Sequence, residues 1–241
     1  MQKSFLRYGL LAILIAAIVG FAFRGPVSAS EKPSTLPKPA VDESLASKPG
    51  QQMATISGGC FWGIQAVFQH VKGVVSATSG YSGGSKSTAD YETVSTGTTN
   101  HAESVQIVYD PSKITYGELL QVFFSVAHDP TQVDQQYPDQ GTQYRSVIFY
   151  ANDEQKKIAD AYIAQLNDAK VYKHKIATQV VAFKAFYPAE RYHQNYATLH
   201  PDNPYIARYD APKVENLQQL YPQLYRAQLT ESNASAMAAS K

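Results

Sequence analysis

The spacing of apolar residues predicts alternating strands and helices between about residues 53 and 228 of the 241-residue chain. One helix is marked by apolar side chains at positions i, i+3, i+4 and i+7, namely Ile64, Val67, Phe68 and Val71. Apolar and polar residues alternate from Glu103 to Tyr109, which predicts a strand whose apolar face includes Glu103. Further strands are expected at residues 53–57, 73–81, 145–150 and 177–183, and further helices after Thr115 and Asn152.

The order of these elements, β-α-β-β-α-β-α-β, predicts an α+β fold. We expect a two-layer sandwich, in which helices pack on a mixed sheet around a ferredoxin-like core. Residues 82–100 and 129–142 are polar and predict long loops, a kind of segment that carries function. A short helix is expected between Tyr187 and Tyr196, and no clear pattern follows it up to about Arg226.

The first 29 residues have the layout of a secretory signal peptide. Basic Lys3 and Arg7 precede an uncharged apolar run over residues 9–23, and the small residues Ser28 and Ala29 follow at a cleavage site. We therefore expect an exported protein in a periplasmic or other extracytoplasmic location. An uncleaved membrane anchor stays open as the alternative, although the run is shorter than the ~20 residues of a transmembrane helix.

Composition divides the rest of the chain into a linker, one domain and a tail. Residues 30–52 are rich in Pro and Ser, and residues 229–241 in Ser and Ala, so both are expected to be flexible. Residues 53–228 remain as a single catalytic domain. Without the three basic residues of the signal, 18 basic residues face 20 acidic ones and form no basic cluster. We therefore expect no nucleic-acid binding. The protein is also expected to be a monomer.

The candidate chemistry centres on Cys60, the only cysteine in the sequence. The only tryptophan, Trp62, follows two positions later. Gly58 and Gly59 predict a tight turn that leaves Cys60 at a helix N-terminus, where the helix dipole favours a thiolate. A single cysteine excludes an internal disulfide, and in an exported chain this indicates a reactive thiol. The alternative is a buried, inert cysteine.

Glu103 is the candidate partner of this thiol. A carboxylate on an apolar strand face is costly unless it is neutralised or paired. Burial raises the pKa of such a carboxyl group toward the range of a general acid, and Cys60 and Glu103 would then share one proton. The alternative is a surface residue paired with Lys or Arg. None of the six histidines stands in a protease-like context.

A set of short motifs, in this order and spacing, resembles the methionine sulfoxide reductase A family over about residues 54–205. The motifs are Gly59-Cys60-Phe61-Trp62-Gly63, Gly80-Tyr81-Ser82-Gly83-Gly84, Tyr91, His101-Ala102-Glu103, Val108-Tyr109-Asp110-Pro111, His128-Asp129-Pro130, Gly141-Thr142-Gln143-Tyr144-Arg145-Ser146 and Tyr192-His193-Gln194. Each string alone is weak evidence, but the ordered set is very specific.

The resemblance implies roles for several residues in reducing the S epimer of methionine sulfoxide in oxidised proteins. Cys60 would attack the sulfoxide sulfur and become a sulfenic acid. Glu103 would protonate the sulfoxide oxygen, with Tyr91 and Tyr144 as hydroxyl donors to the same oxygen.

The resemblance also implies a substrate pocket. Phe61 and Trp62 would form the aromatic wall that receives the terminal methyl group of the substrate, and Asp139 would help to organise the site. His193 is expected to pack behind the site. The segment from Val133 to Tyr137 departs from the more basic, glycine-containing version expected there, which affects substrate preference.

The absence of a second cysteine is the main departure from many family members. Ser95 stands in the loop where a resolving cysteine can occur, and the C-terminus has none. An external thiol, thioredoxin-like, glutaredoxin-like or small, is therefore expected to recycle Cys60, with no metal and no bound cofactor. Two alternatives remain open: a thiol peroxidase that uses Cys60, and a non-catalytic module that binds oxidised peptides.

Overall fold

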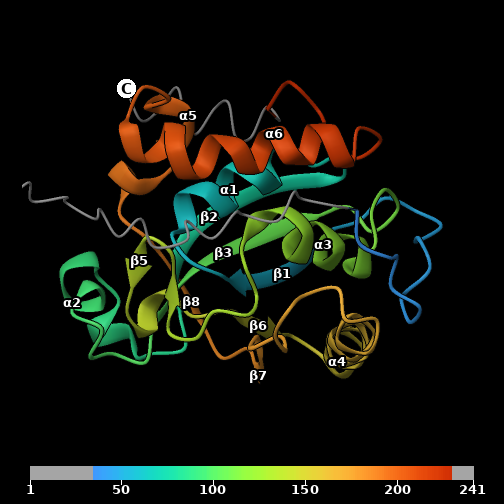
Figure 1. Ribbon diagram of the computed structural model, residues 1–241, viewed down its shortest axis with the longest axis horizontal. Helices are drawn as coiled ribbons and strands as arrows, with labels where there is room; N and C mark the ends of the chain where they lie inside the picture. Colours follow the sequence, from blue (N-terminus) through green and yellow to red (C-terminus); the bar gives the residue numbers. More distant parts are fainter. Residues whose placement is uncertain (1–34, 230–241) are drawn as a thin grey trace, which may run out of the picture. The chain divides into compact units, whose positions relative to one another are not determined.

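The computed structural model describes residues 35–229, and its main feature is a mixed sheet of six strands in the order β7-β6-β1-β3-β2-β8 (Figure 1). Their bounds are β1 Gln52–Ser57, β2 Val74–Ser82, β3 Ala102–Tyr109, β6 Val147–Tyr150, β7 Gln179–Ala182 and β8 Phe186–Pro188. The predicted signal peptide and nearly all of the predicted tail lie outside the described residues.

The four inner strands, in the order β6-β1-β3-β2, pair antiparallel with one another. Helix α1 (Phe61–Gln69) connects β1 to β2, and α3 (Tyr116–Val122) lies between β3 and β6 in the chain. This is the split β-α-β arrangement of a ferredoxin-like core, so the predicted α+β fold is confirmed. Helix α4 (Asp153–Asp168) then leads to β7, which adds to the sheet parallel to β6.

Local sequence signals explain where the long helices begin. The Thr115 hydroxyl accepts the Glu118 N–H and the Glu118 carboxylate accepts the Thr115 N–H, which is the expected capping box of α3. The Asn152 side chain caps α4 by accepting the Gln155 N–H at 2.8 Å. A π-helical turn at Phe123–Ala127 continues α3.

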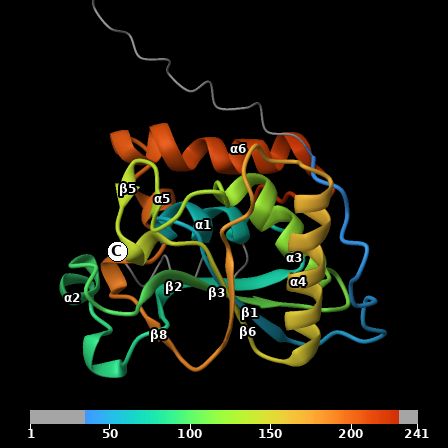
Figure 2. The same ribbon diagram turned by 60° about the horizontal axis from the view of Figure 1, so that its bottom comes forward.

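Helix α6 (Ala211–Leu220) was not expected, and it lies over the outer side of α1 (Figures 1 and 2). Every residue of α1 except Trp62 is buried, because the sheet covers one side of this helix and α6 the other.

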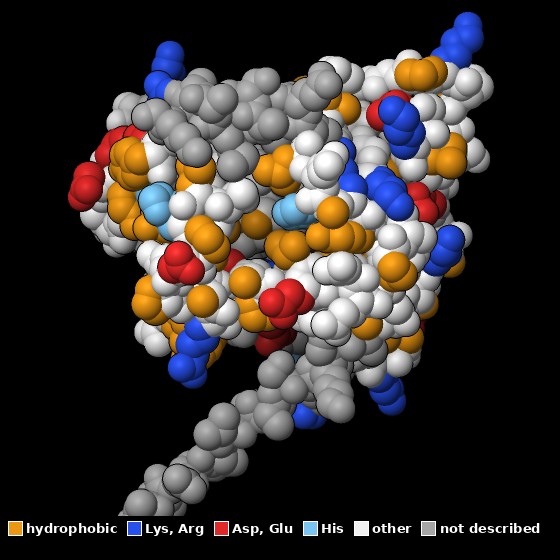
Figure 3. Space-filling model, turned by 90° about the horizontal axis from the view of Figure 1, so that it is seen from above, with side chains coloured by type: hydrophobic (Ala, Val, Ile, Leu, Met, Phe, Trp, Pro, Cys, Tyr) orange, Lys and Arg blue, Asp and Glu red, His pale blue; other side chains and the backbone are white. Residues whose placement is uncertain are grey.

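Seen from above (Figure 3), hydrophobic and histidine side chains gather around a hollow in the surface. The start of α6 carries a signal, since Pro212 follows the N-cap position Asp210.

The polar loops contain short elements that their composition did not predict. These are α2 Tyr91–Ser95, the hairpin of β4 Gln135–Gln136 with β5 Asp139–Gln140, α5 Tyr196–Leu199, 3-10 turns at Lys86–Thr88, Thr142–Tyr144 and Arg191–His193, and a π-turn at Ile206–Asp210. The helix expected from Tyr187 is wrong at its start: Phe186–Pro188 forms edge strand β8, which pairs with β2. Three residues are too few to show a strand alternation in the sequence.

The described part of the predicted linker, residues 35–52, differs from the expected flexible tether. Leu36 is buried, and its N–H donates to the Tyr221 hydroxyl at 2.9 Å. The Asp42 carboxylate accepts the N–H of Gly117 at 2.9 Å, in the first turn of α3. One buried leucine and hydrogen bonds to distant residues hold this segment, so its largely polar composition did not reveal its order. Within the described residues, no helix is both long and apolar enough to cross a membrane.

Candidate active site

Cys60 occupies the N-cap position of α1, and the two glycines before it make room for segments from elsewhere in the chain. Gly59 has φ +96°, and a Cβ atom there would lie 2.5 Å from Cγ of Gln136 on β4. A Cβ atom on Gly58 would lie 2.8 Å from the His128 ring. The turn that presents the thiol therefore requires glycine for its backbone angle and for these close contacts.

Cys60 is buried, with 8% of the residue exposed, and the pKa of its thiol lies well above the ordinary value. Burial is the largest cause, followed by the carboxyl groups of Glu103 and Asp210; the Trp62 N–H and the Lys213 ammonium act in the opposite direction. The expectation that the helix N-terminus yields a thiolate is therefore wrong. Desolvation and nearby anions outweigh the helix dipole.

Glu103 lies at the start of β3 with 3% of its surface exposed, and its Oε2 accepts the backbone N–H of Phe61 at 3.1 Å. Burial raises the pKa of Glu103 to about 8, although the Phe61 N–H lowers it. The carboxyl group is thus mainly protonated at neutral pH, as expected of a general acid. The alternative of a surface ion pair is wrong, since no Lys or Arg pairs with Glu103 among residues 35–229.

Tyr91 and Tyr144 reach the same place from two different segments. Tyr91 is the first residue of α2, and Tyr144 ends the turn Thr142–Tyr144. Burial raises the pKa of both hydroxyl groups, and the charges of Glu103 and Cys60 raise them further. Both phenols are therefore neutral hydrogen-bond donors beside the thiol and the carboxylic acid.

The two aromatic residues after Cys60 differ in exposure. Phe61 is 1% exposed, with its ring 5.2 Å from that of His193. Trp62 is only half-buried: its ring stacks on Tyr196 at 3.9 Å, and its Nε1 donates to His193 Nδ1 at 3.3 Å. Burial lowers the pKa of His193, which agrees with a neutral ring that accepts this hydrogen bond. His193 therefore packs behind the aromatic pair.

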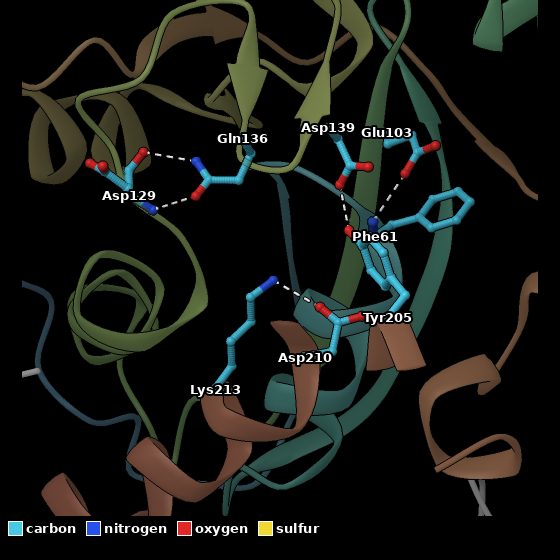
Figure 4. A network of polar contacts seen from close by, with 8 residues as sticks. All are labelled: Phe61, Glu103, Asp129, Gln136, Asp139, Tyr205, Asp210 and Lys213. Carbon is cyan, nitrogen blue, oxygen red and sulfur yellow. Dashed lines mark hydrogen bonds and ion pairs between the residues drawn. The ribbon is translucent and has the colours of Figure 1, made fainter. Parts of the chain in front are cut away.

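Figure 4 shows a polar network next to these residues, most of which the sequence did not reveal. The Tyr205 hydroxyl donates to Asp139 on β5, and burial raises the pKa of the Asp139 carboxyl. Asp210 pairs with Lys213 at 2.9 Å. Of Asp139, Tyr205, Asp210 and Lys213, only Asp139 was expected at the site. Tyr205 and the ion pair lie more than sixty residues along the chain from Asp139, in a region without a periodic pattern, where Pro212 near the start of α6 is the local helix signal.

The structure thus brings together all seven residues expected at the site. Cys60, Glu103, Tyr91 and Tyr144 interact electrostatically with one another, Phe61 and Trp62 adjoin Cys60, and Asp139 acts on Glu103 and Tyr144. In the part of the chain that the structure describes, no group of three or more His, Cys, Asp or Glu side chains is arranged to hold a metal ion. A thiol beside a neutral carboxylic acid can combine nucleophilic attack with proton donation.

Comparison with known proteins places this fold and site in the class of oxidoreductases. A family model described as peptide methionine sulfoxide reductase matches residues 52–224. The chain belongs to the peptide methionine sulfoxide reductase family, and the resemblance seen in its motifs is confirmed.

Relatives in several organisms agree with this assignment. Peptide methionine sulfoxide reductase MsrA 2 of Mesorhizobium japonicum is 62% identical over 185 residues, which cover 77% of this chain and 94% of that protein. The MsrA 2 protein of Synechocystis sp. is 47% identical, covering 89% of this chain and 99% of the relative.

Solved structures of relatives share the fold. Methionine sulfoxide reductase A of Corynebacterium diphtheriae is 32% identical with a TM-score of 0.54, covering 71% of this chain and 90% of that one. Reduced Mxr1 of Saccharomyces cerevisiae is 33% identical with a TM-score of 0.57, covering 68% and 92%. The protein is an oxidoreductase that reduces methionine sulfoxide. This function replaces the two alternatives, a thiol peroxidase and a non-catalytic module that binds oxidised peptides.

Proposed function

We propose that this enzyme repairs oxidised proteins by reducing the S epimer of methionine sulfoxide through direct attack by Cys60. The observation that carries the proposal is the bond between Glu103 Oε2 and the Phe61 N–H, which fixes a neutral carboxylic acid beside the residue that follows Cys60. Free and peptide-bound methionine sulfoxide would react in the same way.

The reaction needs a proton donor because the sulfoxide oxygen is a poor leaving group. Glu103 gives its proton to this oxygen, and the hydroxyl groups of Tyr91 and Tyr144 donate hydrogen bonds to it. The Cys60 sulfur then attacks the substrate sulfur and gives up its thiol proton, which Glu103 takes back, and the oxygen passes to Cys60 as a hydroxyl group. Methionine is released, and Cys60 remains as a sulfenic acid.

The methyl group of the substrate would lie against Trp62, with Phe61 as the buried floor of the pocket. Stacking on Tyr196 and the hydrogen bond to His193 hold the Trp62 ring in one orientation. Protonation makes the substrate sulfur sulfonium-like, and an adjacent indole stabilises such a cation by about 0.5 to 2 kcal/mol. The aromatic pair would therefore favour the protonated substrate. Asp139, bound by Tyr205, would help to organise the site.

Recycling would depend on thiols from outside the chain, since Cys60 is the only cysteine. Two external thiols reduce the sulfenic acid to the thiol and release water, and they leave as a disulfide. A thioredoxin-like or glutaredoxin-like protein, or a small thiol, would supply them. We further propose that the protein is a monomer and that its N-terminal segment directs its export. The mass of the mature chain, isolated from the extracytoplasmic fraction, tests whether cleavage occurs after Ala29.

The test of the reaction is intact mass after incubation with methionine S-sulfoxide and no reductant. One added oxygen on the wild-type chain, none on Cys60→Ser, and a matching yield of methionine are expected. Hydrogen peroxide in a parallel sample gives the rate of a peroxidase reaction for comparison. Reduction of the sulfoxide by Cys60→Ser, or an equal rate with the R epimer, would contradict the proposal.

A further inference from the structure

The ion pair of Asp210 and Lys213 is a feature that the proposed reaction does not use. Asp210 is fully buried, and the Lys213 side chain is 17% exposed. Oδ1 of Asp210 accepts a hydrogen bond from Lys213 Nζ at 2.9 Å, while Oδ2 has no partner among the described residues. Lys213 thus provides the neutralising charge for a carboxylate that burial otherwise disfavours.

The pair lies against the first turn of α1. A Cβ atom on Gly63 would lie 2.1 Å from Asp210 Oδ1 and 2.8 Å from Lys213 Nζ, so the absence of a side chain at Gly63 admits both charged groups. Gly63 follows Cys60 by three residues, within one turn of the helix. Figure 4 shows Lys213 and Asp210 reaching toward this turn from α6 and the residue before it.

The charges around the Cys60 sulfur come from three elements. Glu103 on β3 and Asp210 before α6 oppose a negative charge on the sulfur, and Lys213 on α6 favours one. In the part of the chain described, Lys213 is the cation that acts on Cys60. Neutral hydroxyl groups complete the surroundings, those of Tyr91, Tyr144 and Tyr205.

We propose that Asp210 and Lys213 are positioning residues that set the nucleophilicity of Cys60: Lys213 favours the anionic sulfur, and Asp210 holds Lys213 at Gly63 while limiting its effect. The inference rests on the proposed role of Cys60 as nucleophile. Its physical basis is the position of both charged groups against Gly63, in the first turn of the helix that Cys60 caps. Removing either member leaves one uncompensated charge beside the sulfur, with opposite signs in the two cases.

The test is the rate of Cys60 alkylation by iodoacetamide over neutral and alkaline pH. Because Cys60 is the only cysteine, modification of the chain reports on this sulfur alone. Lys213→Met is expected to slow alkylation at neutral pH about tenfold, and Asp210→Asn to accelerate it. Lys213→Arg keeps the charge and is expected to restore most of the rate. Lys156→Met removes an exposed lysine from a surface pair on α4 and serves as the control.

The opposite directions of the two single variants separate this role from a structural one. If the pair only supported the fold, Asp210→Asn and Lys213→Met would change alkylation in the same direction, and that result would overturn the proposal. An unchanged rate in Lys213→Met would also overturn it. If Lys213→Met does not fold, the double variant Asp210→Asn with Lys213→Met replaces it, because it leaves no unpaired charge. Its alkylation rate is expected near that of the wild type, and the rate of Asp210→Asn is expected to be higher. Alkylation needs no sulfoxide, so the result stands even if the proposed reaction fails.

Discussion

The Phe61 N–H donates a hydrogen bond of 3.1 Å to Glu103 Oε2, and this bond joins the first turn of α1 to the start of β3. The carboxyl group is therefore held beside Phe61, the residue that follows Cys60 and lies 42 positions earlier in the chain than Glu103. Since the pKa of Glu103 is about 8, the acid keeps its proton at neutral pH next to the thiol. The predictions below begin with this relationship.

Glu103→Gln is expected to slow the reductase step about 100-fold or more at neutral pH, because an amide cannot supply the proton. In the wild type, the contribution of the acid is expected to fall as the pH rises through about 8, where Glu103 loses its proton. Single-turnover rates of both proteins against pH check this. Glu92→Gln, on the exposed side of α2, is the control. An unchanged neutral rate in Glu103→Gln would remove Glu103 from the acid role.

Glu103 is also expected to make stability depend on pH. Folding raises its pKa from the ordinary value of 4.5 to about 8, so the folded state binds the proton more tightly than the unfolded state. Its contribution to stability is complete below pH 4.5 and is lost as the pH rises toward about 8. In denaturant unfolding, the free energy of unfolding of the wild type is therefore expected to fall relative to that of Glu103→Gln as the pH rises across this window. Parallel curves for the two proteins would contradict this.

Gly59→Ala is expected to destabilise the fold by about 2 kcal/mol, because φ is positive and the new Cβ meets Gln136. Gly50→Ala is the matched control, since the nearest atom to its new Cβ is 3.9 Å away. Equilibrium unfolding of both variants measures the difference. Equal stabilities would show that the turn before Cys60 tolerates a side chain.

Asp42→Ala tests whether residues 35–52 stabilise the domain. The Asp42 carboxylate accepts the Gly117 N–H and the Thr115 hydroxyl at the start of α3, and loss of such a cap costs about 1 kcal/mol. Asp160→Ala, in a surface pair on α4, is expected to cost far less. Denaturant midpoints of the two variants check this. If residues 35–52 were a free tether, as their composition suggests, the two substitutions would reduce stability equally little, which would contradict this prediction.

Periodicity and capping signals predicted the elements that form the ferredoxin-like core. Ile64 and Phe68 are completely buried, and Thr115 begins α3 with the expected capping box. The elements that were missed have no such signal or a weak one: β8 has three residues, and the order of residues 35–52 depends on partners such as Tyr221. Such contacts join residues far apart in sequence, and a local pattern does not contain them.

The sequence by itself determined the position of the thiol, the acid on the strand face and the family, because these depend on residue type and local spacing. Tertiary structure decided the charge state of the site. The sequence predicted a thiolate at a helix N-terminus, but burial and the carboxyl groups of Glu103 and Asp210 raise the pKa of Cys60. The Asp210–Lys213 pair likewise becomes part of the site only because α6 packs over α1. Desolvation and electrostatic interaction depend on distances in the folded chain, and only the fold sets those distances.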